Sequence, residues 1–142
     1  MLDKILGLDL GTTTLGIAYS DVFGFVHGIE TLRFDRNQYV VARKRVLQLV
    51  EEIGIKEIAI GLPLHLSGQM SEMANNVMRF REDLLKEKPD LIINTVDERL
   101  TSVSANRSIS EQGLNHKKRK ESVDRIAACI ILDTYVRMKE RK

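Results

Sequence analysis

The stretch Lys4-Ile5-Leu6-Gly7-Leu8-Asp9-Leu10-Gly11-Thr12-Thr13-Thr14-Leu15-Gly16-Ile17-Ala18-Tyr19-Ser20 predicts a strand, a tight turn and a second strand. Side chains alternate along a strand, so Asp9 shares a face with Ile5, Gly7 and Gly11, opposite the face of the three leucines. Glycine inside a strand often marks the close approach of a ligand, and a carboxylate in an apolar strand is costly unless it is paired or metal-bound. The stretch therefore indicates room for a metal ion or a phosphate beside Asp9. The alternative is an Asp that only ends a strand and begins a turn.

Size and composition predict one globular domain, residues 1–142. Of its residues, 43% are hydrophobic and 30% are charged, which is ordinary for a compact chain with its own core. The sequence lacks the run of about 18 apolar residues that a membrane span needs, and its N-terminus lacks the long apolar region of a signal peptide. We therefore expect a cytoplasmic protein with no membrane segment. The single cysteine, Cys129, lies in an apolar run and is expected to be a small buried hydrophobe.

The charge is unevenly distributed along the chain. Residues 99–142 hold 11 Lys and Arg against 5 Asp and Glu, although the whole chain carries only +2. The densest block is Lys117-Lys118-Arg119-Lys120. Such a block is either a solvated loop or the electrostatic footprint of a nucleic-acid binder, and charge alone does not decide between them.

The middle of the chain predicts alternating helices and strands. A third antiparallel strand is expected near residues 28–34, and a helix over 38–53 with Gly54 as its stop and Val40 and Val41 in its apolar stripe. Residues 57–63 form a short apolar run that Pro63 ends, which is typical of a strand buried on both faces. Ser71 is expected to cap a second helix, whose stripe is Met73, Val77, Phe80 and Leu84.

The last third adds one strand and one or two helices. A fifth strand is expected at 91–97, a short helix near 102–112, and a final helix over 122–137 that carries Asp124 in its first turn. This order predicts an α/β fold, with a mixed sheet of three antiparallel and two parallel strands flanked by helices and the first strand at its centre. Asp9, Glu98 and Asp124 would then converge from a strand, a strand end and a helix.

These motifs resemble the YqgF or RuvX-like family of the RNase H-like superfamily, which is described as pre-16S rRNA nucleases or Holliday junction resolvases. The resemblance covers nearly the whole chain. Its motifs are Gly7 to Thr12 with Gly16 to Ala18, Gly61-Leu62-Pro63 with Ser67-Gly68, Asp97 to Ser102, the basic block, and Asp124 to Ala128. One departure is that Thr13 and Thr14 stand where the family commonly has a basic pair, which removes a possible phosphate contact.

The resemblance implies that Asp9, Glu98 and Asp124 are the catalytic acids and the ligands of divalent metal. Two Mg or Mn ions about 4 Å apart can activate water and stabilise the leaving oxyanion in phosphodiester hydrolysis, and hard cations prefer oxygen ligands. Asp9 would bridge both ions, and the other two acids would each hold one. From the residues alone, Glu98 could instead form a surface ion pair with Arg99 or a neighbour, and Asp124 could be only a charge at a helix start.

Basic residues are expected to hold the nucleic acid through its phosphates, without reading sequence. They are Arg99, Lys117, Lys118, Arg119 and Lys120, and residues 117–120 are expected to form a mobile loop. Thr101 and Ser102 are expected to cap a helix rather than bind substrate.

Two other function classes remain open. The Leu8 to Thr13 motif also resembles the phosphate loop of actin-like and sugar-kinase ATPases, but those enzymes close two lobes around a nucleotide and this chain supplies one. A non-catalytic nucleic-acid-binding module is the second alternative. For a nuclease, pre-16S ribosomal RNA is the expected substrate and branched DNA the alternative, and the protein is expected to be a monomer or a homodimer.

Overall fold

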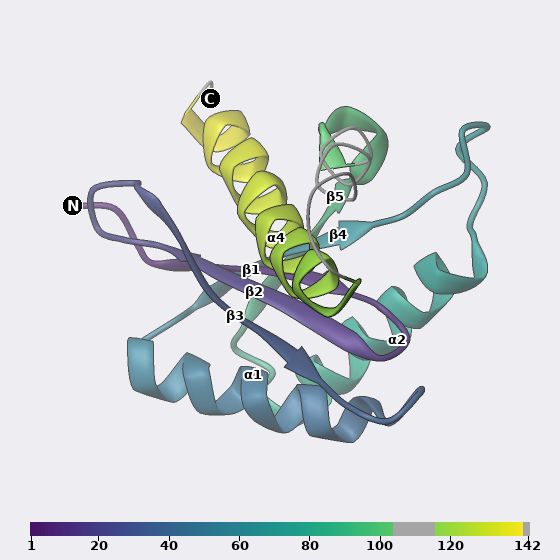
Figure 1. The fold of residues 1–142 in the computed structure, drawn as a ribbon. Helices are drawn as coiled ribbons and strands as arrows, with labels where there is room; N and C mark the ends of the chain where they lie inside the picture. Colours follow the sequence, from purple (N-terminus) through teal and green to yellow (C-terminus); the bar gives the residue numbers. More distant parts are fainter. Residues whose placement is uncertain (104–115, 141–142) are drawn as a thin grey trace.

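The computed structural model describes residues 1–103 and 116–140, and from 116 to 122 it describes the backbone only. A five-stranded sheet has the order β3-β2-β1-β4-β5 (Figure 1). The strands are β1 (Ile5–Leu10), β2 (Thr14–Ser20), β3 (Val26–Arg33), β4 (Glu57–Leu62) and β5 (Ile92–Asp97). The helices are α1 (Tyr39–Ile53), α2 (Glu72–Glu87) and α4 (His116–Glu140), with a short 3-10 turn, η1 (Glu98–Leu100).

Strand β1 lies at the centre of the sheet, as its sequence predicted. It pairs antiparallel with β2, which places Asp9 opposite Gly16, and parallel with β4, which places Leu8 beside Ile60. Strands β2 and β3 are antiparallel, and β4 and β5 are parallel. The predicted mixed sheet of three antiparallel and two parallel strands is therefore confirmed.

The two faces of the sheet are covered by different helices. The leucines of β1 belong to the core that α1 and α2 close, together with Val46 and Phe80. On the opposite face Ile5, Ala18 and Ala59 form a second core with Ala128 and Ile131 of α4. Figure 1 shows α4 crossing this face while α1 and α2 lie beneath the sheet. The alternation of β1 thus sends its leucines to one helical layer and Asp9 to the other.

Small residues let α4 lie close against the sheet. A Cβ on Gly7 would lie 2.6 Å from Leu132 Cβ, and one on Gly61 would lie 2.5 Å from Ile131 Cδ1. A Cβ on Gly16 would collide with the main-chain carbonyl oxygen of Asp124. The glycines beside Asp9 therefore make room for a helix that itself carries a second acid.

The ends of α1 and α2 follow their predicted signals. Gly54 adopts a positive φ of 83° as the C-cap of α1, and the Ser71 hydroxyl accepts a hydrogen bond from the Ala74 N–H at the start of α2. The prediction that Val40 and Val41 belong to the buried stripe is wrong. Both are exposed, because the buried face of α1 is formed by Ala42, Val46, Leu49 and Val50, and at helical spacing residues 40 and 41 point away from that face.

Helix α4 is longer than predicted. It begins at His116 rather than near Ser122, so the prediction of a loop at Lys117 to Lys120 is wrong: the backbone of this block is helical. For the same reason Asp124 lies eight residues inside the helix rather than in its first turn. Most of the short helix predicted near 102–112 falls at 104–115, outside the described residues.

The C-terminal part of α4 is fastened to the sheet by a polar network. The Lys139 ammonium donates to both carboxylate oxygens of Glu57, at 2.7 and 2.8 Å, and the Tyr135 hydroxyl donates to the same carboxylate. The Asn94 amide donates to the Tyr135 oxygen at 2.7 Å. Because Glu57 is buried, these donors offset the cost of removing its charge from water.

Candidate active site

Asp9 is a buried acid in the central strand. Its exposed fraction is 6%, and it lies on the face that α4 covers. The position directly opposite on β2 is Gly16, which has no side chain to fill the space above Asp9. The strand alternation predicted from sequence is what places this carboxylate under the helix.

Asp124 reaches the same place from α4. Its carbonyl oxygen fills the space above Gly16, the direct neighbour of Asp9 across the β1–β2 pair. Its side chain is buried, and the Oδ2 atom finds no hydrogen-bond partner among the described residues. A buried carboxylate oxygen without a donor is rare in folded proteins, and a bound cation is one partner that would offset its cost.

Glu98 follows directly after β5, in η1. Its Cγ and Cδ atoms lie 3.3 Å from the position of a Cβ on Gly61, the penultimate residue of β4. The parallel pairing of β1 with β4 sets Gly61 level with Asp9, one step past the Leu8 and Ile60 pair. The side chain of Glu98 therefore lies over the sheet, at the carboxyl end of β4.

The three predicted acids thus come to one end of the sheet, on the face under α4. Their side chains are not drawn into a compact group: among the described residues, no three His, Cys, Asp or Glu side chains are arranged to hold a metal ion. The donor set nevertheless fits a hard divalent cation, because it offers carboxylate oxygens, including Oδ2 of Asp124, which has no hydrogen-bond partner in the described part of the chain.

Two threonines stand where a basic pair was expected: Thr13 in the loop between β1 and β2, and Thr14 as the first residue of β2. The Gly11 N–H donates to the Thr14 carbonyl at 2.8 Å, and the Thr13 carbonyl accepts from the Phe34 N–H. Thr14 is buried. These residues therefore shape the turn after Asp9.

Arg99, predicted to bind phosphate, is held by other groups of this chain. Its Nε and Nη2 atoms donate to the carboxylate of Asp97, with distances of 2.8 to 3.1 Å, and its Nη1 donates to the carbonyl of Leu66 at 3.2 Å. Hydrogen bonding to Arg99 lowers the pKa of Asp97 below its usual value. Asp97 was not among the predicted site residues, although an acid two residues before an arginine is a spacing that predicts this ion pair. The phosphate role of Arg99 stays a prediction.

The basic block lies near Asp124 along a single helix. Asp124 is four positions after Lys120 in α4, a distance of about 6 Å along the helix axis at about 1.5 Å per residue. Phosphates held by Lys117, Lys118, Arg119 and Lys120 would therefore lie near the acids.

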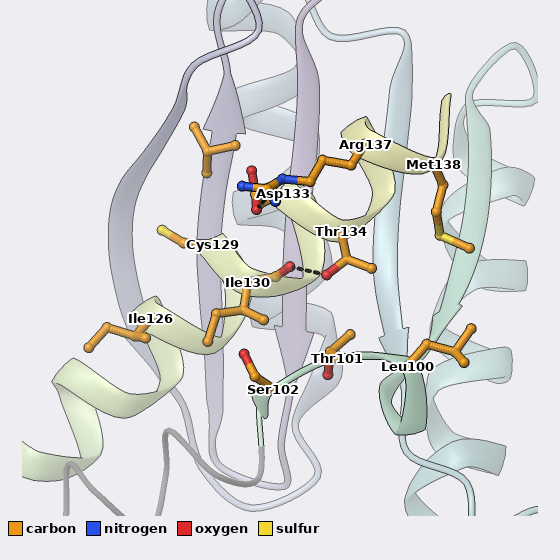
Figure 2. A pocket seen from close by; sticks show the side chains of 11 residues that line it. Leu100, Thr101, Ser102, Ile126, Cys129, Ile130, Asp133, Thr134, Arg137 and Met138 are labelled. Atoms are coloured by element: carbon orange, nitrogen blue, oxygen red, sulfur yellow. Dashed lines mark hydrogen bonds and ion pairs between the residues drawn. The ribbon is translucent and has the colours of Figure 1, made fainter. Parts of the chain in front are cut away.

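A hollow of about 760 Å³ opens beside α4 (Figure 2). Leu100, Thr101 and Ser102 line one side, and α4 residues from Ile126 to Met138 line the other. The Thr101 hydroxyl donates to the Glu98 carbonyl at 2.8 Å and accepts from the Val103 N–H, so it caps locally, as expected. Cys129 also lines the hollow and is only half-buried, and burial raises the pKa of its thiol. None of the three acids lines this hollow.

The chain is similar to proteins of one family along nearly its whole length. The family model described as "RuvX: Holliday junction resolvase" matches residues 3–138. A protein of Geobacillus sp. (strain WCH70), named "Putative pre-16S rRNA nuclease", is 36% identical over 96% of this chain and 99% of its own. A protein of the same name from Acetivibrio thermocellus is 37% identical over 94% of both chains.

Solved structures share the fold at low sequence identity. RuvC of T. thermophilus, solved in complex with a Holliday junction substrate, has a TM-score of 0.60, is 15% identical, and matches over 96% of both chains. The yeast mitochondrial Holliday junction resolvase Ydc2 has a TM-score of 0.54 at 10% identity, over 99% of this chain and 80% of its own. These likenesses show the RNase H-like fold. No helix in the described part of the chain is long and apolar enough to cross a membrane.

Proposed function

This chain belongs to the RuvX family, and from that premise we propose that it is a metal-dependent endonuclease acting on structured nucleic acid, with precursor 16S ribosomal RNA as its substrate. The relatives that carry the corresponding name match over almost their entire length. We also propose that residues 1–142 act as one domain, in the cytoplasm, where ribosomal RNA is processed.

One observation carries the proposal: two buried acids lie on the same face at one end of the sheet, and Oδ2 of Asp124 has no hydrogen-bond partner among the described residues. Asp9 lies opposite Gly16, and the backbone of Asp124 lies directly over that glycine. An uncompensated carboxylate is among the most costly groups to bury. A divalent cation would offset that cost, and this is why we assign the two acids to a metal site.

In the proposed mechanism Asp9, Glu98 and Asp124 hold the metal, and the basic block holds the substrate. The ions, Mg or Mn, would supply an activated water and stabilise the leaving oxyanion. Asp9 would take part in holding the ions together with the acid of α4 and the acid after β5, because its strand lies between β2, over which Asp124 lies, and β4, over which Glu98 lies. Lys117, Lys118, Arg119 and Lys120 would bind phosphates on either side of the scissile bond, which positions the backbone without reading its sequence.

A cleavage panel tests the proposal. Precursor 16S RNA fragments, single-stranded RNA and four-way DNA junctions are incubated with Mg or Mn, using the wild type, Asp9→Asn and Asp124→Asn. Asp133→Asn, whose carboxylate forms an exposed ion pair with Arg137 on the same helix, is the matched control. We expect cleavage of the precursor by the wild type and the control only. Equal cleavage by a folded Asp9→Asn protein would overturn the mechanism.

The second candidate is resolution of four-way DNA junctions, which the description of the matching family favours. A symmetric junction requires two cuts, so this activity calls for a homodimer, whereas precursor trimming can be performed by a monomer. Cleavage of the junction but not of the RNA, by a protein that sediments as a dimer, would select it. Binding to either substrate without metal, and with no cleavage, would select a non-catalytic binding module.

A further inference from the structure

The connection from β4 to α2 projects away from the body of the molecule (Figure 1). It covers residues 63–71, and it carries Leu66, whose exposed fraction is 93%. Single exposed leucines are common on protein surfaces and need no explanation by themselves. Three further observations distinguish this one: the loop is ordered by its own hydrogen bonds, it is tied to the segment that carries Glu98, and it begins at the site.

The loop holds a defined turn. The Gly68 N–H donates to the His65 carbonyl at 2.8 Å, and the His65 N–H donates to the Gln69 carbonyl at 3.0 Å. Gly68 adopts a φ of 90°, which glycine tolerates without strain. At the base of the loop, the Ser71 hydroxyl donates to the Pro63 carbonyl at 2.5 Å. Leu66 is therefore presented on a fixed backbone.

Arg99 ties this turn to the end of β5. Its guanidinium is held by Asp97, and its Nη1 donates to the carbonyl of Leu66 itself. The same nitrogen lies 3.3 Å from the position of a Cβ on Gly68, so a larger residue there would press on the guanidinium. Arg99 directly follows Glu98, and the loop therefore has a fixed position relative to a proposed metal ligand.

The loop also begins at the site. The side chain of Glu98 lies over Gly61, and Leu66 is five positions further along the chain, a span of at most about 18 Å at about 3.6 Å per extended residue. Leu66 therefore lies within a few nucleotides' length of a phosphate that reaches the acids.

We propose that Leu66 is a wedge that enters between adjacent bases of the structured RNA near the cleavage position, with Arg99 as its positioning residue. The inference rests on the proposed function. Apolar side chains inserted at a base step unstack it and kink the helix, which opens the backbone to a protein surface. Leucine suits this role because it has no polar atom to desolvate. A fixed turn suits it because little ordering remains to occur on binding.

Base unstacking by Leu66 is measurable apart from cleavage. In the Asp9→Asn background, which keeps the RNA intact, precursor RNAs carrying 2-aminopurine at successive positions report unstacking as a rise in fluorescence on binding. We expect a rise at one step, which falls about fivefold with Leu66→Ala and returns with Leu66→Phe. Phe23→Ala is the matched control: it removes a side chain that is 73% exposed in the β2–β3 turn, at the other end of the sheet.

In the protein that keeps Asp9, we expect Leu66→Ala to lower the cleavage rate of a fully paired substrate about tenfold. A substrate with a bulge at the unstacked step should be cleaved by Leu66→Ala at close to the wild-type rate, because its bases are already apart. Unchanged fluorescence and unchanged rates in a Leu66→Ala protein that cleaves RNA would overturn the wedge and leave the proposed function standing. A wild type that cleaves no nucleic acid would overturn both.

Discussion

The main-chain carbonyl oxygen of Asp124 occupies the space that a Cβ atom on Gly16 would need. Gly16 lies opposite Asp9 in the β1–β2 pair, so this contact between β2 and α4 brings Asp124 to the strand beside Asp9. The absence of a side chain at residue 16 is thus a requirement of the packing and, in the proposed mechanism, of the metal site as well.

Gly16→Ala is expected to displace α4 from Asp9. The new methyl group meets rigid backbone, so we expect a loss of about 1 to 3 kcal/mol in the free energy of unfolding and a fall in cleavage of at least tenfold. Gly28→Ala is the control, because its Cβ would meet the flexible side chain of Arg125 at 2.9 Å and would lie at an ordinary contact distance of 3.4 Å from Cys129 Sγ, with no backbone atom among these contacts. Denaturant unfolding and cleavage assays measure both effects, and equal behaviour of the two variants would contradict the account.

Divalent metal is expected to stabilise the wild type through the buried acids. At a metal concentration 100 times the Kd, binding adds about 2.7 kcal/mol to the free energy of unfolding. Asp124→Asn should lose this stabilisation, while its stability in chelator should be no lower than that of the wild type, because Oδ2 has no hydrogen-bond partner among the described residues. Thermal unfolding with and without Mn measures this, with Asp133→Asn as control. A full metal shift in Asp124→Asn would remove it from the ligand set.

Salt dependence separates the two predicted sets of phosphate contacts. Replacing Lys117, Lys118, Arg119 and Lys120 with alanine should weaken RNA binding for all sequences and flatten the plot of log K against log salt, by up to about 0.9 per lost contact on duplex. Arg99→Met should leave the slope unchanged, because its guanidinium is engaged by Asp97 and Leu66. A slope reduced by about 1 in Arg99→Met would instead assign Arg99 to a phosphate.

The network around Glu57 is expected to hold the C-terminal part of α4 in place. Lys139→Met leaves a buried carboxylate with fewer donors and should cost about 3 kcal/mol of unfolding free energy. Arg137→Met is the control: it breaks an exposed ion pair with Asp133, worth about 0.5 kcal/mol. A double-mutant cycle of Lys139→Met with Glu57→Gln measures the coupling, and a coupling energy near zero would show that the network is not needed.

The β2–β3 turn is expected to loosen in acid. The Asp21 carboxylate accepts from the Phe23 and Phe25 N–H groups at 2.9 and 3.0 Å and contacts His27 Nε2 at 2.7 Å. The hydrogen bond with His27 and the backbone donors lower the pKa of Asp21 below its usual value of 3.8. Its stabilisation is therefore present above pH 4 and is lost as pH falls through the lowered pKa. Amide chemical shifts of Phe23 and Phe25 should follow this titration and become independent of pH in Asp21→Asn.

Local patterns predicted the fold well because its decisive signals are local. The alternation of residues 4–20 placed Asp9 on the correct face, and Gly54 and Ser71 marked helix ends that the structure confirms. The start of α4 was missed because four adjacent basic side chains disfavour a helix, and the block was therefore assigned to a loop.

The long-range contacts that hold α4 and the β4–α2 loop in place could not be predicted from the sequence. Glu57 and Lys139 are 82 residues apart, and no local pattern links them. The pairing of Arg99 with Asp97 was visible as a spacing, but its hydrogen bond to Leu66 depends on how the β4–α2 loop folds back. The candidate acids could be named by motif, whereas the burial of Asp124 Oδ2 without a hydrogen-bond partner among the described residues depends on how α4 packs against the sheet.

The basic block and Asp124 lie on one continuous helix, α4. If the block grips the backbone of the substrate, the distance from the gripped phosphate to the metal is a constant of the helix, set by about 1.5 Å per residue. The enzyme would then cleave at a fixed distance along the strand from the phosphate that the block holds. Inserting one residue between Lys120 and Asp124 would change the position of the cleaved bond and hence the end of the product.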